Sequence, residues 1–370
     1  MKYISALLLT ASLLTGISTD MAHAQEPAIR TELHEVSPLF RTDTLTVCFL
    51  GDVMMHAEQI TKAYRGDGTY DFSSYFELME SEIEDADIAI ANMEFTLSGE
   101  PYTGYPCFSA PDCFAEYLAD CGFDIFLAAN NHILDKGSEG AARTAGIYRS
   151  LEAERGIRFT GLAESDERKA DNYPLFIRRK GITLALLNFT YGTNLGYTEH
   201  WPKTNYMGMK SEISKALQKA QKADFVIALP HWGPEYELRH SAKQEETALW
   251  LTENGADLII GAHPHVVQDT ASINEVPVVY SLGNAVSNMS ATNTQLELMV
   301  TMKIARHGNG DLEMLPLQLK WLWCSRPGGF SKSYTVIPVE EYLGKEELWE
   351  GRWDYEKMAA TFERVKEQFR

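Results

Sequence analysis

The chain has 370 residues, a formal net charge of −19 at neutral pH and a hydrophobic fraction of 45%. That fraction is typical of a globular protein, and the length suffices for one large domain or two ordinary ones. The negative charge argues against nucleic acid or an anionic lipid surface as a bulk electrostatic partner, because both repel an acidic protein. It leaves open an anionic substrate that a metal ion holds locally.

Residues 1–24 have the composition of a secretory signal peptide. Lys2 gives a positive start, the residues from Ile4 to Ile17 are mostly apolar, and Ala22-His23-Ala24 is a small-x-small cleavage site. The apolar stretch is short for a membrane span. We therefore expect export, with a mature chain that starts near Gln25 and works in the periplasm or at the cell surface.

Short apolar runs bounded by turn signals recur along the chain, and they predict strands buried on both faces. The predicted strands cover residues 45–50, 87–91, 123–128, 158–160, 175–178, 182–189, 225–229, 258–260 and 278–281. Helices are predicted after residue 56 and over residues 76–84, 112–122, 138–155, 210–222, 242–253 and 354–368. Residues 295–305 and 312–320 alternate in polarity, which predicts a terminal hairpin. Residues 99–111 are predicted as a loop over the site, and residues 191–202 as a candidate lid.

The cysteines are odd in number, so an exported form leaves at least one thiol free. They are Cys48, Cys107, Cys113, Cys121 and Cys324. Cys113 and Cys121 would be about 12 Å apart along a helix, which exceeds the reach of a disulfide. A bond between Cys107 and Cys113 fits the intervening turn, and unpaired thiols fit equally well.

Several of the apolar runs follow one pattern, with Asp at the start and Asn, Glu or His at the end. The runs begin at Asp87, Asp124, Asp224 and Asp257, and they lead to Asn92-Met93-Glu94, Asn130-Asn131-His132, His231 and His263-Pro264-His265. A further run ends at Gly51-Asp52. In open α/β sheets ligands bind beyond the carboxyl ends of the strands. Five such ends therefore predict one convergent polar site.

The residue types at these ends suit a divalent metal of borderline hardness, namely manganese, iron or zinc. His263 and His265 on an extended segment would point both rings to the same side. Taken singly, these residues have structural alternatives: Asp52 could cap a helix, and His231 could be a core histidine. Taken jointly, the five strand ends favour a metal site.

Six short motifs occur in a fixed order along the chain. They are Gly51-Asp52, Asn92-Met93-Glu94, Ala129-Asn130-Asn131-His132, His231-Trp232-Gly233-Pro234-Glu235-Tyr236, Gly261-Ala262-His263-Pro264-His265-Val266 and Tyr280-Ser281-Leu282-Gly283-Asn284. Together they resemble the CapA family of bacterial capsule-synthesis proteins, which is associated with poly-γ-glutamate. That family is similar in fold to the calcineurin-like metallophosphoesterases. The resemblance implies an α/β protein with a four-layer α/β/β/α sandwich over residues 44–325 and a C-terminal extension over residues 326–370.

The resemblance also implies a centre with one or two divalent ions. The implied metal ligands are Asp52 and His265 for one ion, Asn131, His231 and His263 for the other, and Glu94 as the bridge between them. Asn92 is the rival for the bridging role. His132 would be catalytic, donating a proton or a hydrogen bond at the reacting group. The candidate substrate-binding residues are His56, Asn130, Trp232, Glu235, Tyr236 and Asn284.

The chain departs from the phosphoesterase pattern at three positions. That pattern has Asp-x-His, whereas here His56 follows Asp52 by four residues. It has Gly-Asp where this chain has Ala91-Asn92, and an acid after Asn-His where this chain has Ile133. These departures leave the second metal and the bridging role open.

Three functions remain as hypotheses. The first is a metal-dependent hydrolase or transferase that acts on an anionic cell-envelope polymer or its phosphorylated precursor, working with membrane proteins of capsule synthesis. The alternative is a non-catalytic assembly or export factor that binds the polyanion. The third is an exported structural domain whose histidines are core residues.

Overall fold

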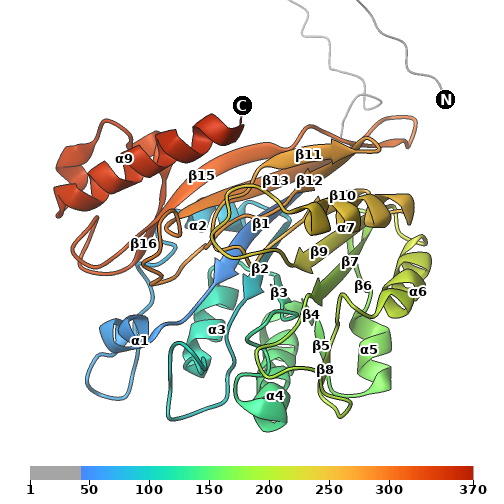
Figure 1. Ribbon diagram of the computed structural model, residues 1–370, viewed down its shortest axis with the longest axis horizontal. Helices are drawn as coiled ribbons and strands as arrows, with labels where there is room; N and C mark the ends of the chain where they lie inside the picture. The colour runs from blue at the N-terminus through green and yellow to red at the C-terminus, as the bar shows by residue number, and fades with distance from the viewer. Residues whose placement is uncertain (1–42, 370) are drawn as a thin grey trace, which may run out of the picture. The chain divides into compact units, whose positions relative to one another are not determined.

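Two β-sheets with helices on their outer faces make up residues 43–369, the part of the chain described by the computed structural model (Figure 1). The first sheet contains, in spatial order, β16 (Thr335–Pro338), β15 (Gln318–Ser325), β13 (Leu296–Arg306), β1 (Asp43–Val53), β2 (Ile88–Met93), β3 (Ile125–Leu127) and β4 (Arg158–Thr160), with β14 (Leu312–Met314) paired to β13. The second contains β11 (Thr270–Ile273), β12 (Val276–Val279), β10 (Leu258–Ile260), β9 (Phe225–His231), β7 (Ile182–Thr190) and β6 (Leu175–Arg179). A short pair joins β5 (Leu162–Ala163) to β8 (Lys203–Thr204).

Nine α-helices lie among residues 43–369. They are α1 (Ala57–Ala63), α2 (Glu80–Glu84), α3 (Asp112–Asp120) and α4 (Gly137–Arg155), then α5 (Asp166–Asn172), α6 (Lys210–Ala220) and α7 (Ala242–Glu253), and finally α8 (Val339–Tyr342) and α9 (Arg352–Lys366). Among residues 43–369 no helix is both long enough and apolar enough to cross a membrane. The predicted signal peptide, residues 1–24, lies outside the described residues.

Three hydrophobic cores separate four layers. Alternate residues of a strand face opposite sides of its sheet. In β1, Phe49 therefore enters the core between the two sheets, whereas Leu50 enters the core beneath α3 and α4. In β7, Leu184 faces the core between the sheets and Ala185 faces the core beneath α6 and α7. The predicted four-layer α/β/β/α sandwich is confirmed.

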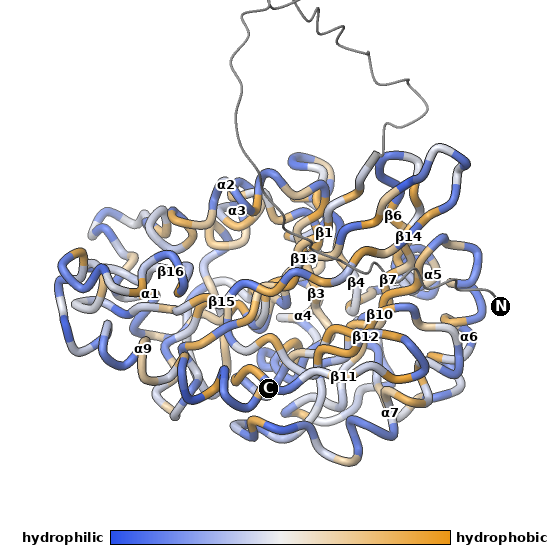
Figure 2. Tube along the Cα trace, turned by 90° about the horizontal axis from the view of Figure 1, so that it is seen from above, coloured by the Kyte–Doolittle hydropathy of each residue, from blue (hydrophilic) through white to orange (hydrophobic). Residues whose placement is uncertain are grey.

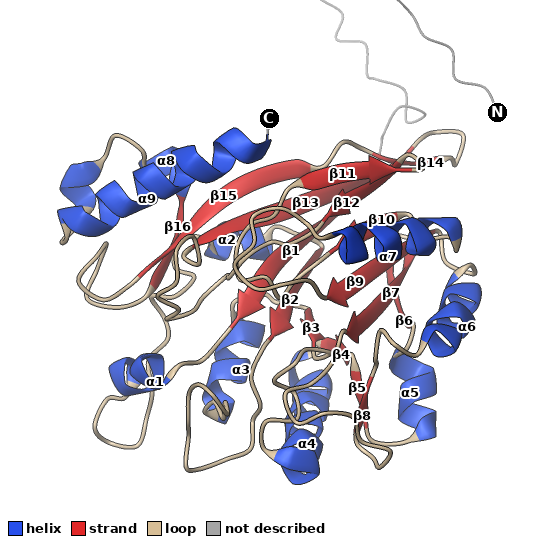
Figure 3. Cartoon of the chain, viewed as in Figure 1, coloured by secondary structure: helices blue, strands red, loops and turns tan. Residues whose placement is uncertain are grey.

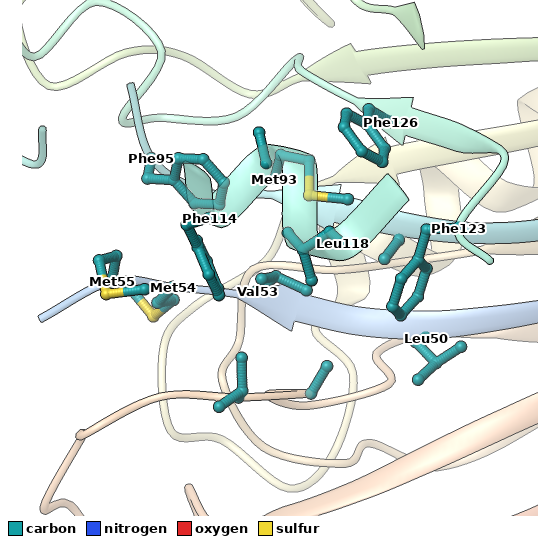
Figure 4. Close-up of a cluster of buried hydrophobic side chains, with 14 of the residues drawn as sticks. Leu50, Val53, Met54, Met55, Met93, Phe95, Phe114, Leu118, Phe123 and Phe126 are labelled. Atoms are coloured by element: carbon teal, nitrogen blue, oxygen red, sulfur yellow. The ribbon is translucent and has the colours of Figure 1, made fainter. Parts of the chain in front are cut away.

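Apolar side chains fill these layers. Figure 4 shows part of the first core, where Leu50 and Val53 of β1 lie with Phe114 and Leu118 of α3. Figure 2 shows apolar residues concentrated along β7, β10 and β12. Strands that are covered on both faces need such continuous apolar runs, which explains why the runs were readable in the sequence.

The aspartate at the start of each apolar run has a structural role. Each of the four carboxylates accepts a hydrogen bond of 2.8 Å from a backbone N–H of the neighbouring parallel strand: Asp87 from Thr46, Asp124 from Ala89, Asp224 from Thr183 and Asp257 from Val226. This bond continues the ladder by one step at the amino end of the strand. The aspartate at the amino end of each run therefore stabilises the sheet, whereas the polar residues after the carboxyl end form the candidate site.

Some predicted elements differ from the structure. The helix predicted over residues 76–84 begins only at Glu80. The strand predicted over residues 312–320 is broken into β14 and β15, and Pro316, which cannot donate to a ladder, lies in the break. The five cysteines, all within the described part of the chain, are unpaired, so the Cys107–Cys113 bond is not formed.

The C-terminal residues pack against the sandwich. β16 pairs antiparallel with β15 at the edge of the first sheet. From α9, Met358, Phe362 and Val365 enter the core between the sheets. The 326–369 segment therefore extends one sheet and covers part of the central core.

Candidate metal centre

The carboxyl ends of five strands meet at one place. Figure 3 shows the arrowheads of β1, β2, β7 and β9 directed toward the same side of the two sheets. Asp52 lies near the end of β1, Glu94 directly after β2, and His231 at the last position of β9. The segments after β3 and β10 add Asn131-His132 and His263-Pro264-His265. The structure thus brings the predicted metal ligands and His132 into one buried cluster.

The backbone around Gly51 places Asp52 in this cluster. The pairing of β1 with β2 shifts register between Leu50 and Asp52. The Gly51 N–H donates to the Glu297 carboxylate at 2.7 Å, and the Asp52 N–H donates to the Gly283 carbonyl at 2.9 Å. A Cβ on Gly51 would lie 2.0 Å from that carbonyl oxygen, so only glycine fits.

Glu94 is at the middle of the cluster. Its side chain is fully buried, and both carboxylate oxygens lack a hydrogen-bond partner among residues 43–369. Its Oε1 lies 3.7 Å from Nε2 of His231 and 3.7 Å from Nε2 of His265. Burial, together with the charges of Asp52 and Glu235, raises the pKa of Glu94 well above its ordinary value. A buried carboxylate without a partner is unfavourable unless a cation or a proton neutralises it.

Two groups of potential ligand atoms share Glu94. One consists of Glu94, His231 and His263, and the other of Asp52, Glu94 and His265; within each group the atoms lie within 4.8 Å of one another. Imidazole nitrogens and carboxylate oxygens suit zinc, iron or manganese. The shared carboxylate and its unpaired oxygens show that these residues fit a metal centre, and they favour Glu94 as the bridge.

Asn92 occupies a different position. Its Nδ2 donates to Oδ1 of Asp52 at 2.7 Å and lies 3.3 Å from Nδ1 of His231. An amide NH₂ is a donor only and cannot bind a metal ion. Asn92 therefore orients Asp52 and His231, which argues against it as the bridging ligand.

The two histidines after β10 do not lie on an extended segment, which corrects the sequence-based expectation. Their φ values are 101° at His263 and 57° at His265, in the left-handed region that non-glycine residues rarely adopt. Such backbone strain persists where the surroundings fix it, often at functional sites. Here the His263 N–H donates to Oδ2 of Asp52 at 3.1 Å. Both rings nevertheless belong to the cluster.

The surroundings shift the pKa values of the three histidines in different directions. Burial and the neighbouring histidines lower the pKa of His231 and of His263 well below the ordinary value, so both are neutral and able to bind metal. Burial also lowers the pKa of His265, but the hydrogen bond and charge of Asp52 outweigh it and the pKa is raised. Nδ1 of His265 lies 2.9 Å from Oδ1 of Asn284, which leaves Nε2 directed toward Glu94.

His132 is held by a carboxylate that the sequence places three residues later. Its Nδ1 donates to Oδ2 of Asp135 at 2.7 Å, and its Nε2 lies 3.9 Å from Oε1 of Glu94. The same Asp135 oxygen accepts the Phe108 N–H at 2.8 Å, which ties the 99–111 loop to the site. Asp135 thus fixes the ring orientation so that Nε2 faces Glu94 in the cluster of candidate ligands.

The family model described as bacterial capsule synthesis protein PGA_cap matches residues 46–289. The chain belongs to this family. It is 27% identical over 309 residues to the PGA biosynthesis protein CapA of Bacillus subtilis, covering 80% of this chain and 75% of that protein. It is 28% identical over 292 residues to the capsule biosynthesis protein CapA of Bacillus anthracis, covering 75% and 68%. The predicted CapA resemblance is confirmed.

Solved structures with some similarity include two nucleotidases. One is a 5′-nucleotidase precursor from Thermus thermophilus, with a TM-score of 0.44, 12% identity, and coverage of 88% of this chain and 59% of that one. The other is the NAD nucleotidase of Haemophilus influenzae, with a TM-score of 0.45, 10% identity, and coverage of 88% and 63%.

The candidate substrate-binding residues of this CapA-family chain fall into two sets. Glu235 and Tyr236 are exposed beside the histidines, and the Tyr236 ring lies 6.4 Å from the His265 ring. Of the other four, Asn130, Trp232 and Asn284 are buried, and His56 is partly buried. Oδ1 of Asn284 lies against Nδ1 of His265, and Asn130 donates to the Met93 carbonyl at 2.8 Å. His56 is the N-cap of α1 and forms a capping box with Gln59. Trp232 is fully buried and donates to the Tyr280 carbonyl at 2.9 Å.

The position of Trp232, directly after His231, explains why its side chain is buried in the core and does not reach the site. His231 faces the centre, so its neighbour in an extended segment faces the opposite side. Trp232 therefore packs in the core beneath α6 and α7, with no exposed surface for a ligand. His56 is likewise absent from the ligand groups; its backbone is extended, and α1 begins only after it.

The 191–202 loop supplies contacts that sequence reasoning did not assign. Asn194 donates its backbone N–H to the Asn131 carbonyl at 2.9 Å, and its side chain lies 3.3 Å from Nδ1 of His132. The Tyr191 ring lies 4.6 Å from the His263 ring and is 45% exposed, so it forms part of the rim of the site. No local sequence pattern marks these residues, since they meet the centre only through tertiary packing.

Proposed function

We propose that this CapA-family protein is a metal-dependent hydrolase or transferase of capsule synthesis. The observation that carries the proposal is the fully buried Glu94 carboxylate, which has no hydrogen-bond partner among residues 43–369 and is shared by two ligand groups. A cluster that served only packing would not keep an unpaired carboxyl beside three histidines. The substrate would be an anionic cell-envelope polymer or its phosphorylated precursor, with a phosphoester as the simplest scissile bond.

Asp52, Glu94, His231, His263 and His265 would hold the metal, with Asn131 as a further oxygen ligand. Oδ1 of Asn131 lies 2.8 Å from Nε2 of His231, so it borders the same space. A divalent ion supplies Lewis-acid polarisation of the scissile phosphoryl or acyl group. The buried surroundings strengthen this electrostatic effect because they exclude water.

His132 would transfer the proton. A carboxylate accepts hydrogen bonds and cannot donate them, so Asp135 keeps the proton of the neutral ring on Nδ1 and stabilises the charged ring. Nε2 is then the nitrogen that gains or gives a proton at the reacting group, at the edge of the ligand cluster. Asn194 and Phe108 restrict the ring from two loops.

The site would act outside the cytoplasmic membrane, in line with the signal-like residues 1–24. Membrane proteins of capsule synthesis are the natural partners of such an activity. The acidic chain carries no bulk positive charge for a polyanion, so a metal ion would supply the local attraction.

Elemental analysis and a substrate screen test the proposal. Protein purified without chelators should contain divalent metal and turn over a phosphoester or γ-glutamyl substrate. Glu94→Gln should lose both metal and turnover, whereas Glu139→Gln, which removes an exposed carboxylate of α4, should lose neither. Unchanged turnover in Glu94→Gln and in Asp52→Ala would refute catalysis at this centre. Polymer binding that survives chelation, without hydrolysis, would favour the non-catalytic assembly factor.

A further inference from the structure

A third group of potential ligand atoms lies at the mouth of the centre. It consists of Glu235, His263 and His265, again with the atoms within 4.8 Å of one another. Glu235 is exposed, whereas the residues of the other two groups are all buried. The third group is therefore the one that an ion from solvent meets first.

The outer group overlaps with both inner groups. His263 also belongs to the group of Glu94 and His231, and His265 also belongs to the group of Asp52 and Glu94. Nδ1 of His263 is buried and has no hydrogen-bond partner among residues 43–369. An ion held at the mouth would thus keep one histidine while it exchanges Glu235 for Glu94.

The surroundings make direct entry to the inner groups difficult. Asp52 and Glu94 have no exposed surface, and the rings of Tyr191 and Tyr236 border His263 and His265 at 4.6 Å and 6.4 Å. A hydrated divalent ion must exchange its water for protein ligands as it enters this buried cluster. Stepwise replacement of water by a carboxylate and then by imidazoles lowers the barrier to that exchange.

We propose that Glu235, together with His263 and His265, forms a loading position through which the divalent cation enters the buried centre. The proposal rests on the metal centre of the proposed function and adds a separate role for Glu235. Glu235 would bind the ion transiently, and the filled centre would not need it.

The rate of metal uptake tests this role. Metal-free protein is mixed with zinc chloride or manganese chloride in a stopped-flow instrument, and a metal indicator reports the free ion over time. Glu235→Gln should load roughly tenfold more slowly than wild type, since a local anionic group raises the on-rate of a cation by about that factor or more. Glu237→Gln is the matched control, because Glu237 is exposed on the same loop, carries the same charge and belongs to no ligand group.

Equilibrium dialysis of the same proteins separates the outcomes. The loading position is supported if wild type and Glu235→Gln reach the same final metal content and only Glu235→Gln takes up metal slowly. Uptake by Glu235→Gln at the wild-type rate overturns it and leaves the metal centre intact. A loss of bound metal at equilibrium in Glu235→Gln also overturns it, because Glu235 would then be a permanent ligand. Wild-type protein that binds no ion would refute the proposed function as well.

Discussion

Glu297 on β13 accepts a hydrogen bond from Gly51, the neighbour of Asp52 in the candidate metal centre, and its burial leads to a prediction about stability. Its side chain is fully buried, Oε1 accepts the Gly51 N–H at 2.7 Å, and Oε2 has no partner among residues 43–369. Burial and the charge of Asp52 raise its pKa from 4.5 to about 8, against the opposing effect of the Gly51 bond. The folded protein therefore keeps the Glu297 proton over a pH range in which the unfolded chain has released it.

The sign of the pH dependence follows from this difference. The folded state binds more protons than the unfolded state between pH 4.5 and about 8, so the stability linked to Glu297 is fully present below pH 4.5 and is lost as the pH rises toward 8. The slope approaches about 1.4 kcal/mol per pH unit. Between pH 5 and pH 9 this amounts to a loss of roughly 4 kcal/mol.

Glu297→Gln removes the titration but keeps an acceptor for the Gly51 N–H. The variant is expected to match wild type at pH 5 to within about 1 kcal/mol, since its unpartnered amide NH₂ replaces a carboxyl O–H that also lacks a partner among residues 43–369. Between pH 5 and pH 9, the free energy of unfolding of the variant should rise by roughly 4 kcal/mol relative to that of wild type. Urea unfolding of metal-free protein, followed by tryptophan fluorescence, gives both free energies of unfolding.

The difference between variant and wild type isolates Glu297, because the other carboxyls titrate in both proteins. Glu363→Gln, an exposed change on α9, serves as the control and should show no comparable shift. A free-energy difference that stays constant from pH 5 to pH 9 would refute the buried, protonated state of Glu297.

Three further outcomes are expected. Asp135→Asn should lower turnover about a hundredfold, because a neutral amide neither fixes the His132 proton on Nδ1 nor stabilises the charged ring, while elemental analysis finds the metal content unchanged; full activity would contradict the proton-transfer role. Gly51→Ala should destabilise the fold by about 2 kcal/mol in thermal melts, because its Cβ meets the Gly283 carbonyl, whereas Gly208→Ala, with no atom within 4 Å, should be neutral; equal melting temperatures would contradict this. Divalent metal added at a hundred times its Kd to metal-free protein should raise the free energy of unfolding by about 2.7 kcal/mol in urea unfolding. An equal gain in Glu94→Gln would count against Glu94 as a ligand.

Local sequence determined the strands and the polar residues at their carboxyl ends. A strand covered on both faces must be a short apolar run, and the turn that follows it must carry any polar group of the site. Asp52, Glu94, His231 and His265 could therefore be named from the sequence. The order of their motifs also sufficed to indicate the family.

Tertiary structure alone decided how these residues are oriented and supported. Glu297 lies 246 residues from Gly51, and Asn194 lies 62 residues from His132, so no local pattern records either contact. The left-handed backbone at His263 likewise occurs with a bond from its N–H to Asp52, which lies 211 residues away in the sequence. A strand end fixes which side chains reach the site, but their hydrogen-bond partners come from whichever loops the packing brings beside them.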